Sequence, residues 1–503
     1  MVFLASPHGS RWIIGLFAVA MLVGTLGRDV RRPLWHDEIF TQYVASASAT
    51  AGLWNVLSTG VDLNPPLYYL CVRIAAAILG EGAVATRLPS TLGFLVACLA
   101  LYVFMRRRVH PWFAIVAALA LPMTSAVIYA YEGRPYGLLL GLSAVALAAW
   151  QWRSERRGSA PLILCGLALA AAAFTHFYAV LMVLPLAAGE ATRVFIRRRI
   201  DWAMWMVLGF AIGVPLLLLR PLVRAARQFA ATFWSGPTTE KLMLFYRELP
   251  EPLALLLIIA VACMAISVVV SPDGAGDKDA LELPRDASRK AGLQPDEAAA
   301  TVVMALLPFI GFVVALKTGA FHGRYVIQAV LGLGILVAWG FSVLINSRRH
   351  AAILLATLFV AFGGRMAAGA IGIVTGPDDP LEDVQPLLSK TKDDVPLVAS
   401  HVLDYLLIAH YADASTRTRL LYLMQPPPDP RRGIRTADRA MRLLTDFAPL
   451  RVEDLDAFVA THQRFYVYGR PSFLVPALLS RGASVRFLGQ NDEASLYVVD
   501  VTR

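Results

Sequence analysis

The sequence contains few charged residues and only four cysteines, and both shortages limit the kind of protein that it encodes. Charged residues make up 16% of the 503 positions, whereas hydrophobic residues make up 57%. Soluble domains carry about 25% charged residues, so most of this chain is expected to lie in a lipid bilayer. No two cysteines form a CxxC pair. We therefore expect buried free thiols and no structural zinc.

Other common signals are also missing. No small-x-small cleavage site is obvious between the end of the first apolar run and Arg28, so this run is expected to be a retained membrane span rather than a signal peptide. The net charge of +10 does not indicate a nucleic-acid partner, because many arginines gather at the ends of apolar runs. After residue 376 the chain contains neither a Gly-rich phosphate loop nor a nucleophile elbow.

Long apolar runs are the main feature that is present. About eleven of them approach the roughly 17–25 residues that a helix needs to cross a bilayer. They lie near 11–27, 86–105, 111–130, 134–152, 160–175, 177–194, 202–219, 251–271, 300–316, 325–345 and 351–373.

Arginine clusters orient these runs. When the chain is threaded alternately through a membrane, four clusters fall on the same side: 106–108, 153 with 156–157, 197–199 and 348–349. Such clusters favour the cytoplasmic side of a membrane. The N-terminus is therefore expected on the cytoplasmic side of a bacterial-type inner (plasma) membrane. Loop 28–85 and everything after 374 are expected on the outer side.

The predicted fold is a multi-span α-helical membrane domain over residues 1–375, followed by an extracytoplasmic α/β domain over 376–503. The outer loop 28–85 contains two amphipathic stretches, 39–57 and 65–79, that are typical of helices lying in the membrane interface. Residues 272–299 are polar and rich in Asp, Gly and Pro, which predicts a flexible cytoplasmic linker.

In the C-terminal part, strand-like stretches alternate with helical ones, as in a small α/β domain. The expected strands are 396–400, 419–424, 465–468, 484–488 and 495–500, and the expected helices are 401–411, 436–447, 453–462 and 472–481. We assign this domain no chemistry and expect it to shape the acceptor site or to stabilise the protein.

Polar residues at the ends of membrane spans are costly and are therefore candidates for function. The outer-side turns collect carboxylates, arginines, a histidine and aromatic residues: Asp37, Glu38, Asp62, Asn64, Tyr68, Arg87, Arg134, Tyr136, His176, Tyr178, Arg324 and Tyr325. Such a set suits a reaction in which a base activates an acceptor and cations hold an anionic leaving group. Arginine binds phosphate through two parallel hydrogen bonds and keeps its charge at any working pH.

Structural roles stay open for several of these residues. Asp37 could cap an interfacial helix, and Glu38 could be a first-turn acid that the helix dipole favours. Arg134 and Arg324 could be anchors whose charged ends reach the interface. A divalent metal is an alternative that we do not favour, because the acidic and histidine residues have no ligand spacing. We assign no metal ligand and no certain cofactor.

Six short motifs follow one another along the chain. They are Asp37-Glu38, Asn64-Pro65-Pro66-Leu67-Tyr68-Tyr69, Arg87-Leu88-Pro89-Ser90, Glu132-Gly133-Arg134-Pro135-Tyr136, Thr175-His176-Phe177-Tyr178 and Gly323-Arg324-Tyr325. In this order they resemble the GT-C superfamily of polyprenyl-phosphate-sugar-dependent glycosyltransferases. The branch they resemble most contains protein O-mannosyltransferases, the lipid A aminoarabinose transferase and rhizobial lipopolysaccharide galacturonosyltransferases. The resemblance covers residues 10–345 approximately.

The resemblance implies a multi-span helical fold with juxtamembrane helices in the first outer loop. It also implies transfer of a sugar from a polyprenyl-phosphate donor to an acceptor on the outer side, typically with inversion. The acceptor would be a glycolipid, lipopolysaccharide, polysaccharide or protein of the cell envelope. By position, Asp37 would be the base that activates the acceptor hydroxyl, and Glu38 would support it or bind the donor. Arg134 and Arg324 would hold the donor phosphate.

The chain departs from this family at one place. Some relatives have an acidic residue and a lysine directly before the Pro-Pro pair, whereas this chain has Leu63 and Asn64 there. Asp62 lies one position earlier. Whether Asp62 supplies a second carboxylate to the site stays open.

Two other classes of protein fit the hydropathy. A secondary transporter usually shows internal repeats and helices broken at mid-membrane, and no repeat is visible in this sequence. A non-catalytic envelope scaffold would leave the Asp37-Glu38 pair unexplained. The sequence therefore favours an enzyme, with the transporter and the scaffold as alternatives.

Overall fold

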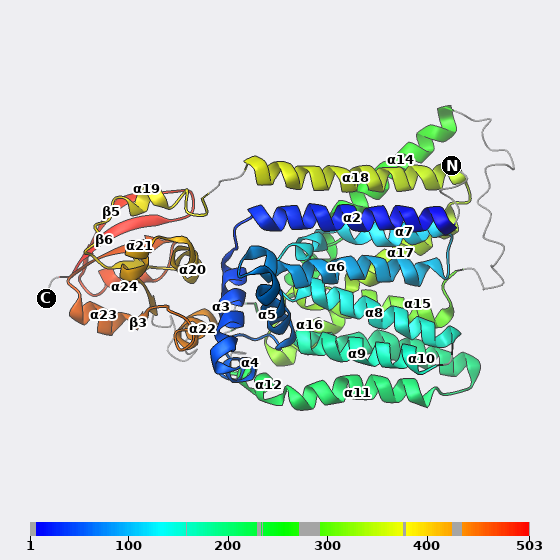
Figure 1. The fold of residues 1–503 in the computed structure, drawn as a ribbon, viewed down its shortest axis with the longest axis horizontal. Helices are drawn as coiled ribbons and strands as arrows, with labels where there is room; N and C mark the ends of the chain where they lie inside the picture. Colours follow the sequence, from blue (N-terminus) through cyan, green and yellow to red (C-terminus); the bar gives the residue numbers. More distant parts are fainter. Residues whose placement is uncertain are drawn as a thin grey trace. The chain divides into compact units, whose positions relative to one another are not determined.

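The computed structural model describes residues 7–156, 158–228, 233, 235–270, 292–375, 379–424 and 435–501 (Figure 1). These residues form two compact units. The first comprises Met1–Arg31, Asn64–Arg220 and Ser235–Val374, and the second comprises Arg32–Leu63, Pro221–Trp234 and Thr375–Arg503.

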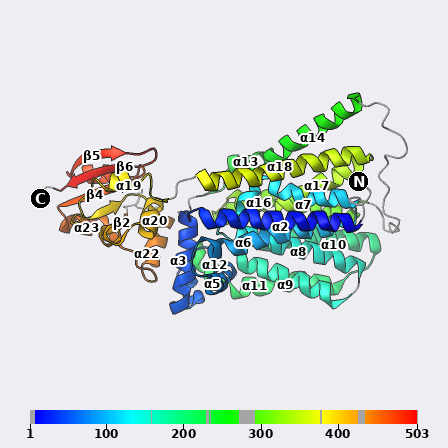
Figure 2. The same cartoon turned by 45° about the horizontal axis from the view of Figure 1, so that its top comes forward.

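The first unit is a bundle of helices. Its α-helices are α2 (Pro7–Arg31), α5 (Leu67–Leu79), α6 (Ala83–Arg106), α7 (Pro111–Ala120), α8 (Tyr136–Glu155), α9 (Ser159–Thr175), α10 (Val183–Arg197), α11 (Trp202–Leu218), α13 (Thr239–Glu248), α14 (Glu251–Val270), α15 (Pro295–Ala305), α16 (Leu307–Thr318), α17 (Ala329–Leu344) and α18 (Arg348–Thr375). Short 3-10 helices, η1 (Leu121–Met123), η2 (Ser125–Ala130), η3 (Phe177–Met182) and η7 (Gly323–Val326), lie between them. Figures 1 and 2 show α2, α6, α8 and α9 side by side.

This bundle confirms the predicted multi-span helical fold. Each of the eleven apolar runs expected to span the membrane is mostly helical in the structure. Among the described residues, five helices are long and apolar enough to cross a membrane, or up to seven if each of two bent helix pairs is one span. Shorter apolar helices such as α9 and α17 coincide with remaining runs. The total of eleven spans stays a prediction.

Helices α6 and α8 pack closely because glycines line their contact. A Cβ added to Gly93 of α6 would lie 2.3 Å from the Cα of Leu138, and one added to Gly141 of α8 would lie 2.4 Å from the carbonyl oxygen of Gly93. Gly137, one turn before Gly141, approaches the carbonyl oxygen of Ser90 in the same way. Small residues four positions apart let helix backbones approach in a membrane protein. This contact fixes the start of α8 against α6.

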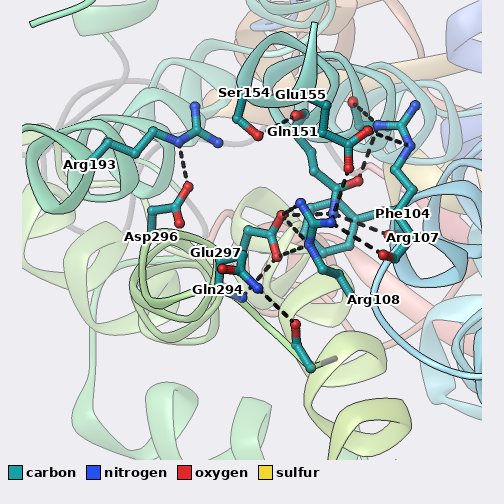
Figure 3. A network of polar contacts seen from close by, with 12 residues as sticks. Phe104, Arg107, Arg108, Gln151, Ser154, Glu155, Arg193, Gln294, Asp296 and Glu297 are labelled. Carbon is teal, nitrogen blue, oxygen red and sulfur yellow. Dashed lines mark hydrogen bonds and ion pairs between the residues drawn. The ribbon is translucent and has the colours of Figure 1, made fainter. Parts of the chain in front are cut away.

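A buried polar network joins the ends of α6, α8 and α10 to the start of α15 (Figure 3). Arg108 Nη2 lies 2.7 Å from Glu297 Oε1, and Gln151 Nε2 donates to the same oxygen at 2.9 Å. Arg193 of α10 pairs with both Glu190 and Asp296. Because buried charges are stable only when they are paired, this network fixes which helices can pack together at this end.

The predicted flexible linker over 272–299 is wrong at its C-terminal end. Residues 271–291 lie outside the described residues, but α15 begins at Pro295. Asp296 and Glu297 are only 5% and 1% exposed. The polar composition predicts a linker, but both carboxylates have arginine partners more than 100 positions earlier in the chain.

The cysteine prediction is only partly correct. Cys98 and Cys165 are buried free thiols, as expected. Cys71 is half-buried, and Cys263 on α14 is exposed. The difference arises because apolar surface that faces lipid is not buried inside the protein, and an apolar run does not reveal which of its sides faces outward.

The second unit contains a six-stranded sheet, which confirms the predicted C-terminal α/β domain. Its strands are β1 (Leu397–Ala399), β2 (Leu420–Met424), β3 (Val452–Asp454), β4 (Arg464–Gly469), β5 (Ser484–Gln490) and β6 (Ser495–Asp500), in the order β3-β2-β1-β4-β6-β5. Its helices are α19 (Gln385–Leu388), α20 (Val402–Tyr411), α21 (Ala414–Arg419), α22 (Thr436–Leu444), α23 (Leu455–Thr461) and α24 (Leu474–Leu479).

Strands β1 to β4 run parallel, and β6 pairs antiparallel with both β4 and β5. Every position of β2 is buried, as expected for a parallel strand covered on both faces. The five predicted strands are all present. The sixth strand, β3, overlaps the start of the helix predicted over 453–462, which instead begins at Leu455. The sequence does not reveal β3, because a strand of three residues is too short to show a period.

The second unit also contains the first part of loop 28–85, which was predicted to lie outside the membrane. Helices α3 (His36–Ala51) and α4 (Leu53–Ser58) form the first expected interfacial stretch, and α12 (Arg220–Arg227) is a further helix of this unit. Helix α3 packs against α20 of the α/β domain. The second expected interfacial stretch, α5, belongs to the first unit. The domain limits 1–375 and 376–503 stay a prediction.

Candidate active site

A cluster of histidine, tyrosine and arginine side chains lies at one end of the helical bundle. It comes from three segments far apart in the sequence: the start of α8, the turn between α9 and η3, and η7. The ring of His176 lies 5.7 Å from that of Tyr136, 6.0 Å from that of Tyr178 and 5.1 Å from that of Tyr325, measured between centroids. The structure therefore brings four of the predicted site residues together.

Arginines border this cluster. The guanidinium carbon of Arg324 lies 5.4 Å from the centre of the Tyr136 ring, which is within the range of a cation–π contact. Arg134 is 8% exposed, and its carbonyl oxygen accepts a hydrogen bond from Ser90. Both arginines lie close enough to His176 for their positive charges to lower its pKa. Two guanidinium groups at one place are suited to hold a phosphate.

Two histidines fix the backbone on which these groups are mounted. His176 Nδ1 accepts the N–H of Tyr178 at 3.2 Å, and His322 Nδ1 accepts the N–H of Arg324 at 3.3 Å. Each histidine caps the 3-10 helix that follows it. Burial, together with the charges of Arg324 and Arg134, lowers the pKa of His176 to about 3. His176 is therefore a neutral hydrogen-bond acceptor at working pH.

Tyr178 also ties two segments together. Its hydroxyl donates to the carbonyl oxygen of Ala320 at 2.5 Å and lies 3.0 Å from the hydroxyl of Thr318. Its ring lies 5.6 Å from that of Tyr325. These contacts fix the end of α16 and the start of η7, so Tyr178 helps to place Arg324.

Three other candidates lie in the first unit, and two of them make contacts between helices. The hydroxyl of Tyr68 donates to the carbonyl oxygen of Thr86 at 2.8 Å, which joins α5 to α6. Arg87 is fully buried, and its Nη1 donates to the carbonyl oxygen of Asp29 at 3.3 Å, which joins α6 to α2. Asn64 is 7% exposed. A role in substrate binding stays a prediction for Tyr68, Arg87 and Asn64.

The acidic candidates Asp37, Glu38 and Asp62 belong to the second unit. Glu38 is fully buried, and its Oε2 accepts the N–H of Trp35 at 3.2 Å, which caps the start of α3. The side chain of Asp37 is 27% exposed, with Oδ1 3.6 Å from Nε2 of His36. Asp62 Oδ1 accepts the N–H of Leu63 at 2.5 Å. Of the adjacent pair, Asp37 is the carboxylate that solvent can reach.

Sequence reasoning missed one contributor to the cluster, Tyr129 of η2, whose ring lies 5.0 Å from that of Tyr136. His322, which the sequence places in the same turn as Arg324 and Tyr325, caps η7. Tyr129 lies inside an apolar run, so nothing in the sequence distinguishes it. Among the described residues, no group of three or more His, Cys, Asp or Glu could hold a metal ion.

Comparisons with known proteins place this arrangement in a structural context. Residues 63–219 match the family model described as dolichyl-phosphate-mannose-protein mannosyltransferase. No curated protein matches the sequence. Among solved structures, ArnT from Cupriavidus metallidurans in the apo state has 15% identity and a TM-score of 0.57, with 97% of this chain and 98% of that chain covered.

A second structure of ArnT from Cupriavidus metallidurans, bound to undecaprenyl phosphate, has 16% identity, the same TM-score and the same coverage. At this identity the match shows a shared fold over nearly the whole of both chains. The family match covers four of the predicted site motifs in full, at 64–69, 87–90, 132–136 and 175–178. The shared fold and the family match together confirm the resemblance of this chain to the GT-C superfamily.

Proposed function

We propose that this protein is a membrane glycosyltransferase that moves a sugar from a polyprenyl-phosphate-linked donor to an acceptor of the cell envelope. The observation that carries the proposal is the meeting of Arg134, Arg324, Tyr136 and His176 at one end of the bundle. A neutral histidine and aromatic rings surround two guanidinium groups there. Such a site can bind a phosphate monoanion or dianion beside an apolar lipid chain.

The fold supports a polyprenyl donor. The ArnT structure that contains undecaprenyl phosphate shares the fold of this chain over 97% of its length. We extend to this chain a lipid of that class as the donor carrier, with the helical bundle in the bilayer. The family match to a mannosyltransferase model supports a sugar as the transferred group.

The proposed reaction is a single displacement. Asp37 accepts the proton of the acceptor hydroxyl while the acceptor oxygen bonds to the anomeric carbon of the sugar. The bond from that carbon to the phosphate oxygen breaks, and its electron pair stays on the polyprenyl phosphate. Arg134 and Arg324 stabilise the negative charge of this leaving group. Attack from the face opposite the leaving group inverts the anomeric centre.

The proposed site is on the outer side of an inner (plasma) membrane. The cluster lies at the starts of α8 and α17, whereas Arg108, Glu155 and the other charged residues of the network lie at the opposite helix ends. Because arginine clusters favour the cytoplasmic side, the His176 cluster then faces outward, as does the C-terminal domain.

The test is transfer of labelled sugar by the full chain in membranes. The donors are undecaprenyl phosphates that carry labelled mannose, aminoarabinose or galacturonate, and the acceptors are envelope lipids and envelope proteins. One donor is expected to give a labelled product, and Asp37→Asn is expected to lower the rate at least a hundredfold with normal protein content. Asp456→Asn, which changes an exposed carboxylate of the α/β domain, is the control and should leave the rate unchanged. Transport of a sugar without a covalent product, or full activity of Asp37→Asn, would contradict the proposal.

A further inference from the structure

The helix that begins with the Asp37 motif is held by a tyrosine of the C-terminal domain. Tyr411, the last residue of α20, accepts the N–H of Leu34 on its hydroxyl oxygen at 2.6 Å. The same hydroxyl lies 3.4 Å from the carbonyl oxygen of Leu34, to which it donates. These two residues are 377 positions apart in the chain. Leu34 stands three positions before Asp37 and is 3% exposed.

A second contact supports the first. The ring of Tyr43 on α3 lies 6.1 Å from the ring of His410 on α20, edge to face. Ile39 and Val44 of α3 are fully buried. Helix α3 therefore packs against α20 of the α/β domain, and Tyr411 fixes Leu34, two residues before the helix begins.

The entry into α3 decides where Asp37 points. Trp35 is in an extended conformation, and the N–H groups of Glu38 and Ile39 both bond to the Trp35 carbonyl oxygen, which starts the helix. Leu34 precedes this turn directly. If its N–H and carbonyl groups lost their partner, they would have to find water or another group. The first turn of α3, and the carboxylate on it, would then shift or fray.

We infer that Tyr411 is a positioning residue for Asp37, so that the α/β domain takes part in placing the proposed base. The inference rests on the proposed function, because it assumes that Asp37 is the base. The role is not catalytic in the strict sense: the Tyr411 hydroxyl contacts the backbone of Leu34 and acts through it.

The chain provides a matched control on the same helix. The hydroxyl of Tyr405 accepts the N–H of Arg451 at 2.7 Å and donates to the Arg451 carbonyl oxygen at 3.0 Å. This is the same pair of hydrogen bonds as at Tyr411, but its partner lies inside the α/β domain. Tyr411→Phe and Tyr405→Phe thus remove the same group from α20, and only the first removes a contact to the segment that carries Asp37.

The experiment compares wild type, Tyr411→Phe and Tyr405→Phe as full-length chains in lipid nanodiscs. The first measurement is hydrogen exchange of the amides of residues 34–47. The second is the rate of sugar transfer from the undecaprenyl-phosphate donor that serves the wild type. In Tyr411→Phe we expect faster exchange and a kcat about ten- to a hundredfold lower, because a displacement of about 1 Å costs about a hundredfold. The KM for the donor should stay near that of wild type.

Tyr405→Phe should leave both the exchange of residues 34–47 and kcat unchanged. His410→Ala, which removes the ring contact to Tyr43, is the second variant and should act in the same direction as Tyr411→Phe. An unchanged exchange rate or an unchanged kcat in Tyr411→Phe overturns the inference, as does an equal loss in Tyr405→Phe. If Asp37→Asn is itself fully active, the assignment of the base fails instead, and the exchange measurement still tests whether Tyr411 holds α3.

Discussion

Arg108 and Glu297 form a buried ion pair although they are 189 positions apart in the sequence. Arg108 Nε lies 2.7 Å from Glu297 Oε2, and Nη2 lies 2.7 Å from Oε1. Arg108 also lies 3.0 Å from Glu155 Oε1. The pair joins the end of α6 to the start of α15, so it connects the first half of the bundle to the helices that follow residue 291.

Loss of this pair should destabilise the bundle. Glu297→Gln leaves the Arg108 guanidinium with Glu155 as its remaining anionic partner, and the expected cost is about 3 kcal/mol, at the low end for a broken buried pair. Thermal unfolding of the purified protein measures it. Asp456→Asn is the control, because the pair of Asp456 with Arg481 is exposed and should contribute about 1 kcal/mol or less. Equal effects of the two changes would show that Glu297 is not a structural partner.

The sequence predicted the helices of the bundle better than it predicted their partners. Apolar runs of sufficient length identify helices by composition alone, and all eleven were found. The start of α15 was missed because Asp296 and Glu297 look like linker residues, and their burial depends on Arg193 and Arg108. No local pattern reports a pairing across more than 100 positions. Burial of a charge can be predicted only together with its partner.

The close contact of α6 with α8 should be necessary for folding. Gly137→Leu should prevent α8 from packing on α6, since even a Cβ at this position would lie 2.4 Å from the carbonyl oxygen of Ser90. We expect little folded protein in the membrane fraction, measured by fluorescence-detected size exclusion. Gly213→Leu on α11 is the control, because no atom lies within 4 Å of a Cβ added there. Normal folding of Gly137→Leu would refute the role of this contact.

Arg324 should matter for binding of the lipid phosphate. Arg324→Ala removes one of the two guanidinium groups near His176 and should weaken binding of undecaprenyl phosphate by about tenfold or more, which corresponds to a charge-assisted hydrogen bond of about 1.5–3 kcal/mol. Arg324→Lys should restore binding only in part, because lysine lacks the planar fork. Binding is measured with the purified full chain in detergent.

Arg106 offers a matched control for this measurement. Its guanidinium carbon lies 6.0 Å from the centre of the Tyr102 ring, a similar cation–π arrangement at the C-terminal end of α6. Arg106→Ala should leave the affinity for undecaprenyl phosphate unchanged. If Arg324→Ala also leaves it unchanged, Arg324 is an anchor at the membrane interface and does not hold the donor.

The sequence predicted only part of the site. The motifs identified the residues that meet around His176, since polar groups at the ends of apolar runs are few. They did not show that Tyr68 and Arg87 are buried between helices. They also did not show that Leu34 is held by Tyr411, because a backbone hydrogen bond across 377 positions has no signature in composition. Residue types indicate chemistry, whereas the partners that orient them come from the folded chain.

His401 should make the α/β domain less stable in mild acid. Burial lowers the pKa of His401 below its ordinary value of 6.5; Arg470 and Arg435 act in the same direction, and Asp404 and Asp438 oppose them. The unfolded chain therefore binds a proton that the folded chain does not. Stability from this group is present above about pH 6.5 and declines as the pH falls below it.

A conservative substitution separates this titration from the structural role of His401. Its Nδ1 accepts the N–H of Leu403 and caps α20, and asparagine is a good capping residue that does not titrate. Hydrogen exchange of the α20 amides, corrected for the intrinsic effect of pH, should show wild type opening more readily at pH 5.5 than at pH 7.5, and His401→Asn should reduce that difference. Part of the difference should remain, since burial also lowers the pKa of His410. An identical pH dependence in both proteins would mean that His401 does not control the acid stability of this domain.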